Sequence, residues 1–272
     1  MSGKDGADAK RGRCSMFRRV WAGIFLGFCC AFFSLYAAKV GLLVVATGKY
    51  TEFVGPLVDS ARRYFCPGHE VTYFIFTDGE IEPAQDIVKL FHPRLGWPFD
   101  TMMRYGAYNR HSGQLMGQDY LFACDADMLF CDTVGDEILS ERVATLHPGY
   151  IGVRGTYETN PNSSACVFAQ EGQLYFAGGF YGGTTAEVLC AVQTNLDHIT
   201  KDLEQGIIAL WHDESHWNRY CIDHPPTRIL SPSYCYPESA GEHYFRIWGG
   251  KVYAPKLLAL DKNHGEIRTT SP

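Results

Sequence analysis

The alternation of apolar and polar stretches along the chain predicts an α/β fold. Apolar, largely β-branched or aromatic runs bounded by turn residues are typical of buried strands. We expect strands at residues 40–46, 70–77, 87–91 and 120–124. Apolar residues recur with helical spacing at 50–65, 101–115 and 186–208, the last with a break near Gly206. Alternating strands and helices predict a doubly wound sheet, which binds its ligands beyond the carboxyl ends of its strands.

An uncharged segment of 19 residues, 20–38, precedes the first expected strand. Its length suffices for a membrane-spanning helix, and the basic pair Arg18-Arg19 before it favours a cytosolic N-terminus. We therefore expect a cytosolic tail at 1–19, a single-pass type II anchor at 20–38 and a lumenal domain at 39–272. A cleaved signal peptide and a buried core helix are the alternatives, which the long apolar part and the basic flank disfavour.

Composition narrows the class of protein. The 272 residues are 46% hydrophobic, which excludes wholesale disorder. The net charge is −6 and no long basic run occurs, so nucleic acid is not an expected partner. The ten cysteines include no C-x-x-C pair, which disfavours a zinc ribbon without predicting any disulfide pairing. A glycosylation sequon at Asn162 suits a lumenal domain.

Two carboxylates, Asp125 and Asp127, follow the expected strand 120–124. Residues i and i+2 of an extended chain point to the same side, so these side chains can converge on one site. A divalent cation is a natural occupant, because Mg²⁺ often takes one or two carboxylates and completes its shell with phosphate and water. A chance or turn-forming D-x-D is the alternative.

The densest group of chemically active side chains lies at 211–220. His212 and His216 are four residues apart, which would place them on one helix face. The zinc-protease motif needs Glu directly after the first His, and Asp213 stands there instead, so a zinc hydrolase is disfavoured. A polar first turn of a helix is a second interpretation. The third is a sugar site, in which Trp211 stacks on a ring and Asp213 and Glu214 face hydroxyls and the anomeric carbon.

Taken together, these segments resemble glycosyltransferase family 6. The matching segments are 45–50, 73–78, Asp125–Asp127 with 134–139, 145–150, 176–183, 211–220, 230–232, and Lys262 to His264 with Arg268. They cover nearly the whole chain from about residue 40 to the C-terminal tail.

The resemblance implies a Golgi membrane enzyme with a single catalytic domain of the GT-A type, built on a Rossmann-like mixed sheet. It implies retaining transfer of N-acetylgalactosamine or galactose from a UDP-sugar, with Mn²⁺, or alternatively Mg²⁺, as the cofactor. The expected acceptor is a galactose- or N-acetylgalactosamine-terminated glycan of a glycolipid or glycoprotein, joined in α1,3 linkage. A homodimer is compatible with these expectations. A catalytically inactive lumenal carbohydrate-binding relative is the alternative function.

The resemblance also assigns roles to individual residues of this chain. Asp125 and Asp127 would hold the metal, and Glu214 matches the catalytic carboxylate. The residues expected at the donor are Ala46, Thr47, Tyr50, Arg104, Asp125, Ala126, Asp127, Ala177, Gly178, Gly179, Asp213, Lys262 and Arg268. The residues expected at the acceptor are His147, Trp211, Glu214 and Tyr236.

Donor choice in this family depends on the three residues that correspond to Ala177, Gly178 and Gly179. Small side chains there leave room for an N-acetyl group, whereas bulkier ones exclude it. We therefore expect UDP-N-acetylgalactosamine to be preferred over UDP-galactose. Tyr236 and Pro237 stand where the family carries Trp-Asp in a segment that binds the acceptor, so the sequence leaves the acceptor unidentified.

Overall fold

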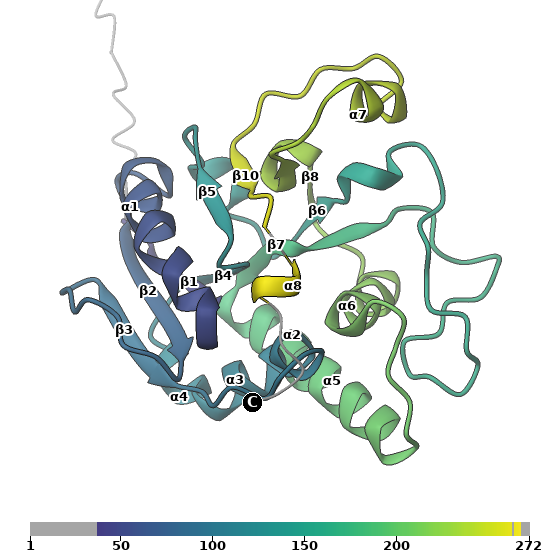
Figure 1. Cartoon of the computed structure of the whole chain (residues 1–272), viewed down its shortest axis with the longest axis horizontal. Coiled ribbons are helices and arrows are strands. Elements are labelled where there is room, and N and C mark those ends of the chain that lie inside the picture. Colours follow the sequence, from purple (N-terminus) through teal and green to yellow (C-terminus); the bar gives the residue numbers. More distant parts are fainter. Residues whose placement is uncertain (1–36, 263, 268–272) are drawn as a thin grey trace, which may run out of the picture. The chain divides into compact units, whose positions relative to one another are not determined.

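The computed structural model describes residues 37–262 and 264–267. A seven-stranded sheet forms its centre, with the strand order β3-β2-β1-β4-β7-β6-β8 (Figure 1). The sheet is mixed, because β7 runs antiparallel to both of its neighbours, β4 and β6. A smaller sheet has the order β5-β10-β9. The strands are β1 Lys39–Val45, β2 Glu70–Thr77, β3 Ile87–Phe91, β4 Tyr120–Cys124, β5 Met128–Phe130, β6 Arg142–Leu146, β7 Phe176–Thr184, β8 Arg228–Leu230, β9 Tyr236–Pro237 and β10 Leu257–Ala259.

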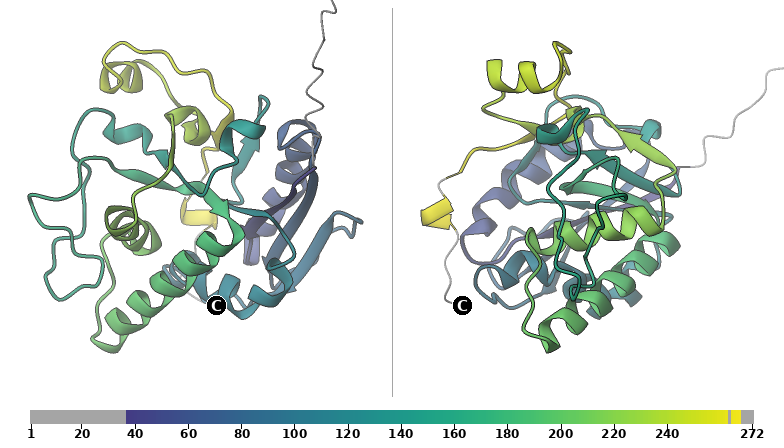
Figure 2. Two further views of the ribbon diagram at one scale, coloured as in Figure 1. Left: turned by 180° about the vertical axis from the view of Figure 1, so that it is seen from behind. Right: turned by 90° about the vertical axis from the view of Figure 1, so that its right-hand side faces the viewer.

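The helices lie on both faces of the large sheet (Figures 1 and 2). They are α1 Val54–Tyr64, α2 Phe99–Met102, α3 Arg104–Arg110, α4 Ser112–Leu115, α5 Thr185–Glu204, α6 His212–Asp223, α7 Glu242–Ile247 and α8 His264–Ile267. Side chains alternate between two cores along the central strands, as the period of two in a strand requires. In β4, Phe122 packs on the α1 side, whereas Leu121 and Ala123 pack on the side of α3, α5 and α6.

The four strands expected from the apolar runs are confirmed: 70–77, 87–91 and 120–124 have the expected bounds, and the first strand is shifted by one residue at each end. The helix expected at 50–65 begins as a 3₁₀ turn, Gly48–Phe53, before α1. The helix expected at 101–115 is instead three short helices, α2 to α4, which break at Met103 and His111. The first of these breaks places Arg104 at the start of α3.

The last residue of the segment that we expected to span a membrane, Ala38, belongs to the folded domain. Ala38 packs into the core beside α1, and its backbone amide donates a hydrogen bond to His69 Nδ1 at 3.1 Å. Residues 1–36, with most of the expected anchor, and Arg268 in the tail lie outside the described residues. Within the part of the chain that is described, no helix is both long and apolar enough to cross a bilayer.

Candidate active site

The carboxyl ends of β1, β2 and β4 meet at one edge of the large sheet, because these three neighbouring strands are parallel. Asp125 follows β4 there, and its amide donates a hydrogen bond to the Gly179 carbonyl oxygen at 2.9 Å. Since β7 is antiparallel to β4, it is the beginning of β7, with Gly178 and Gly179, that reaches this edge. The first turn of α6 adds Asp213 and Glu214. The topology therefore brings together three segments that are far apart in sequence.

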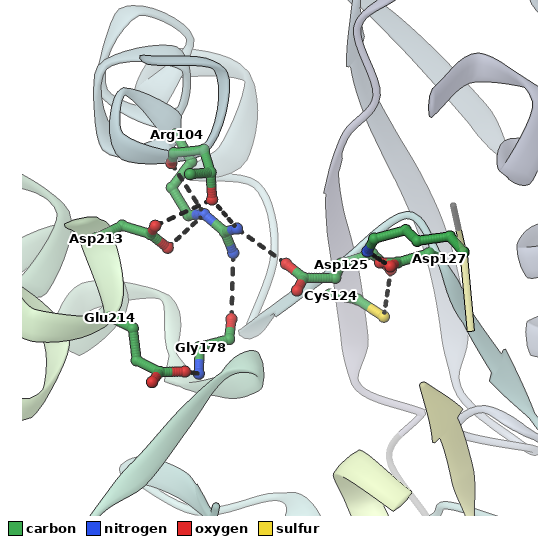
Figure 3. A network of polar contacts seen from close by, with 9 residues as sticks. Arg104, Cys124, Asp125, Asp127, Gly178, Asp213 and Glu214 are labelled. Carbon is green, nitrogen blue, oxygen red and sulfur yellow. Dashed lines mark hydrogen bonds and ion pairs between the residues drawn. The ribbon is translucent and has the colours of Figure 1, made fainter. Parts of the chain in front are cut away.

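Arg104 contacts residues from three segments of this site (Figure 3). Its Nη2 lies 2.9 Å from Asp125 Oδ1, its Nε lies 2.9 Å from Asp213 Oδ2, and its Nη1 donates to the Gly178 carbonyl oxygen at 3.1 Å. Burial by itself lowers the pKa of the guanidinium, but Asp213 and Asp125 raise that pKa well above its usual value. Arg104 therefore stays charged and joins β4, β7 and α6, since all three elements direct an oxygen at it.

Asp213 is buried and its two carboxylate oxygens face different partners. Oδ1 accepts a hydrogen bond from the Thr101 hydroxyl at 3.0 Å, while Oδ2 pairs with Arg104. Asp213 therefore has a structural role, and its expected contact with a sugar stays a prediction. Thr101 itself, at the end of α2, was not singled out from the sequence, because nothing in the local pattern marks it.

Glu214 points at the start of β7 rather than at Arg104 (Figure 3). Its Oε2 accepts a hydrogen bond from the Gly178 amide at 2.7 Å. Burial raises the pKa of the Glu214 carboxyl to about 7, although the Gly178 amide opposes this shift. Asn218, one helical turn later, fixes the arrangement, because its side chain bonds both backbone groups of Phe176 at 2.8 Å.

Asp125 and Asp127 line the same two pockets, as the D-x-D spacing predicted, but they have different partners. Asp125 pairs with Arg104, whereas Asp127 forms an ion pair with Lys262 from the C-terminal tail. Within 37–262 and 264–267, no group of three or more His, Cys, Asp or Glu side chains is placed to hold a metal ion. A cation at this site would thus take at most two protein carboxylates, and the rest of its shell would come from a ligand and water.

The first pocket lies beside Tyr50 and has a volume of about 70 Å³. Of the residues expected at the donor, it is lined by Thr47, Tyr50, Arg104, Asp125, Ala126, Asp127 and Lys262. Lys262 Nζ lies 5.3 Å from the centre of the Tyr50 ring. Ala46 does not line this pocket, because its side chain is buried in the core beside α1.

A second pocket, of about 310 Å³, lies between the two tryptophans Trp97 and Trp211 and reaches Gly178, Gly179 and Glu214. Trp211 is 45% exposed, which leaves its ring available to a ligand. Trp97 was missed in the sequence, because it stands in a proline-rich segment with no motif of its own.

His212 and His216 do not form a shared face. His212 begins α6 with a φ of 52° and its ring meets that of Trp97 at 4.9 Å. His216 is buried instead, with Nε2 3.8 Å from Asp202 Oδ2. The two rings contact different partners, Trp97 and Asp202, so the structure gives no support to a histidine metal pair.

A third pocket, of about 440 Å³, opens on the other side of Glu214 and is lined by His147, Ala177 and Tyr244 among others. Burial lowers the pKa of His147 to about 4, so the imidazole is neutral at ordinary pH. Tyr236 does not line the pocket. Its ring packs against Trp248 at 5.3 Å, while its neighbours Cys235 and Pro237 form the wall. Asn162 is exposed on the loop after β6, away from these three pockets.

Comparisons with known proteins agree with this geometry. The chain matches glycosyltransferase family 6 over residues 19–269. It is 35% identical to histo-blood group ABO system transferase 1 of Rattus norvegicus, over 92% of this chain and 74% of that protein. It is 32% identical to globoside alpha-1,3-N-acetylgalactosaminyltransferase 1 of Gallus gallus, over 84% of this chain and 69% of the relative. Identity to alpha-1,3-galactosyltransferase 2 of Homo sapiens is 26%, over 84% and 70% of the two chains.

The family match spans both the strand end that carries Asp125 and Asp127 and the helix that carries Glu214. The mixed α/β architecture fits a domain of the GT-A type, as the sequence predicted. The chain belongs to glycosyltransferase family 6.

Proposed function

We propose that this protein is a retaining hexosyltransferase that moves N-acetylgalactosamine, or galactose, from a UDP-sugar in α1,3 linkage to a glycan. The observation that carries the proposal is Glu214, a largely buried carboxylate held by the Gly178 amide at 2.7 Å between two pockets. In this position the carboxylate can face the anomeric carbon of a donor sugar, either as a nucleophile or as a stabiliser of positive charge. Relatives of the chain carry the names of transferases for both sugars.

The donor diphosphate is assigned to Asp125 and Asp127 with a divalent cation, Mn²⁺ or Mg²⁺. Both side chains reach the pocket beside Tyr50, and oxygen ligands are those that hard cations prefer. A cation held there would supply positive charge to the diphosphate. Arg104 pairs with Asp125 and fixes its position, and Lys262, which pairs with Asp127, would be available to the phosphates if a cation took its place at Asp127.

The beginning of β7 is assigned to donor choice. A Cβ atom at Gly179 would lie 3.2 Å from Cys235 Sγ and 3.5 Å from Asp125 Oδ2, and one at Gly178 would lie 3.4 Å from Glu214 Oε2. Any side chain here therefore takes space between the leaving group and the catalytic carboxylate. We expect UDP-N-acetylgalactosamine to have the higher kcat/KM, and Gly179→Ala to shift the preference toward UDP-galactose.

The test is release of UDP from each donor by the purified protein, with Mn²⁺ or with chelator, and with a panel of galactose- and N-acetylgalactosamine-terminated glycans. Linkage analysis of the product checks both the α configuration and the 3-position. Asp127→Asn should abolish the metal-dependent part of donor binding. If the wild-type protein binds a glycan but releases no UDP under any of these conditions, the inactive carbohydrate-binding alternative holds.

We also propose that the protein works in the Golgi as a single-pass type II membrane protein, anchored by the expected segment 20–38 except for Ala38, which packs in the folded domain. The proposal rests on the apolar length of that segment and the basic residues before it. Protease protection of a C-terminal tag in sealed vesicles, with removal of the glycan at Asn162 by endoglycosidase, tests this topology. Sedimentation of the solubilised protein tests the expected homodimer.

A further inference from the structure

Two charged side chains that line the first pocket, Arg94 and Asp100, have no role in the site described above. Arg94 comes shortly after β3 and Asp100 lies in α2, in a segment that carries no motif. In the large sheet, β3 and β4 lie on opposite sides of β1, so Arg94 enters the pocket from the side away from Asp125 and Asp127 (Figure 1). Because the diphosphate is assigned to those two aspartates, the Arg94 side is left for the nucleoside.

The guanidinium of Arg94 packs against backbone. A Cβ atom at Gly48, where φ is 55°, would lie 3.1 Å from Nε and 3.3 Å from Cζ of Arg94, so glycine lets the planar group approach the turn after β1. Among the described residues, Arg94 makes no hydrogen bond or ion pair, whereas the other basic side chains of the pocket, Arg104 and Lys262, pair with aspartates. The N–H groups of Arg94 are thus available to a ligand.

Asp100 leaves one carboxylate oxygen for the same ligand. Its Oδ1 accepts hydrogen bonds from the Leu95 amide at 2.7 Å and from the Thr47 hydroxyl at 3.3 Å, which fix the side chain. Within 37–262 and 264–267, Oδ2 has no hydrogen-bond partner, and no ion pair joins Asp100 to Arg94 although both line one pocket. The pocket therefore offers a donor and an acceptor that do not satisfy each other.

The imide edge of uracil is complementary to this pair. Its 4-oxygen accepts a hydrogen bond and its N3–H donates one, and the 4-oxygen points away from the ribose, toward the side of the pocket that holds Arg94. Tyr50, which is half-buried, lines the same pocket, and an aromatic ring can stack on a base. Cytosine carries an amino group at position 4 and no hydrogen on N3, so it would leave both Arg94 and Asp100 unpaired.

We propose that Arg94 and Asp100 bind the imide edge of the uracil of the donor, Arg94 at the 4-oxygen and Asp100 at N3–H, and so select uridine over cytidine nucleotides. The inference rests on the proposed function, since it concerns the nucleotide of the UDP-sugar.

The test compares the dissociation constants of UDP and CDP for the purified full-length protein, measured by calorimetry with Mn²⁺. The two ligands share the ribose and the diphosphate, so the ratio of their constants reports on the base alone. For the wild-type protein we expect UDP to bind about 100-fold more tightly, about tenfold for each hydrogen bond that CDP cannot make. Arg94→Met should weaken the binding of UDP without weakening that of CDP, which lowers the ratio about tenfold.

Asp100→Asn changes only the second contact. Asparagine keeps the oxygen that accepts from Leu95 and Thr47, but its amide can donate to N3 of cytosine, so this variant should also lower the ratio about tenfold. Arg110→Met is the matched control, because it removes the same charge at the end of α3 and Arg110 lines none of the three pockets. It should leave both constants unchanged.

Thermal melts check that each variant is folded. Equal weakening of UDP and CDP in Arg94→Met would show that the guanidinium contacts the ribose or the diphosphate, and would overturn its contact with the base. A wild-type ratio that neither Arg94→Met nor Asp100→Asn changes would overturn the inference as a whole. Failure of the wild-type protein to bind UDP would instead contradict the proposed function.

Discussion

At the scale of single residues, the chemistry of this site depends on the protonation of Glu214. Burial raises its pKa to about 7, and the proposed role requires the ionised carboxylate. A raised pKa means that the protonated form predominates below that value, so kcat should fall about tenfold per pH unit on the acidic side and level off on the basic side. The measurement is the pH profile of kcat at saturating donor and acceptor, whose acidic limb gives the pKa of the group that must be ionised.

Glu214→Gln provides the control for that profile, because glutamine has nearly the same shape and no ionisable proton. We expect turnover to fall by about 10²–10⁴-fold and the acidic limb to disappear, while UDP binding measured by calorimetry is retained. A variant with near-normal turnover would show that Glu214 does not act on the anomeric carbon.

At the residue scale, the sequence indicated a candidate site where chemically active side chains stand at neighbouring positions. Asp125 and Asp127 are two residues apart, and Asp213 and Glu214 are neighbours, so local spacing alone could indicate a site. Trp97 and Thr101 line the first two pockets from the segment around α2, and Cys235 lines the third from a distant part of the chain. Their participation depends on tertiary contacts, which no short motif records.

At the scale of elements, the apolar runs predicted the strands well, but β7 was not predicted as a strand. Its sequence, FAGGFYGGT, is rich in glycine, which strands usually disfavour. The structure gives the reason at Gly182, where a Cβ atom would lie 2.3 Å from the Leu121 carbonyl oxygen of β4. β7 can therefore approach β4 closely only because it lacks side chains at such positions.

We expect Gly182→Ala to destabilise the fold by about 2–4 kcal/mol, because the contacting atom belongs to backbone that must move. Gly55→Ala is the matched control, since no atom lies within 4 Å of a Cβ built at Gly55 in α1. That substitution should be neutral or stabilising by up to about 1 kcal/mol. Urea unfolding followed by circular dichroism measures both, and equal midpoints for the two variants would contradict the proposed packing of β7 on β4.

At the scale of the whole molecule, the two ends of the described chain meet at the donor pocket. Tyr50 follows the first strand, whereas Lys262 comes after the last, and the lysine lies over the tyrosine ring while it pairs with Asp127. Figure 1 shows α8, beyond Lys262, in front of the central strands. The sequence assigned Tyr50 and Lys262 to one donor site only through the family resemblance, because about 200 residues separate them and no local pattern connects them.

Lys262 should therefore strengthen donor binding, even though it must first exchange Asp127 for the diphosphate. A hydrogen bond to a charged group contributes about 1.5–3 kcal/mol, so we expect Lys262→Met to raise the KM for the UDP-sugar at least about tenfold at constant Mn²⁺. Lys256→Met is a matched control: Lys256 also pairs with an acid, Glu137, and also lies over a tyrosine ring, that of Tyr234, yet it lines none of the three pockets. Its loss should leave the KM for the donor unchanged. Tighter donor binding in Lys262→Met would show the opposite role, in which the tail competes with the donor for Asp127 rather than closing over it.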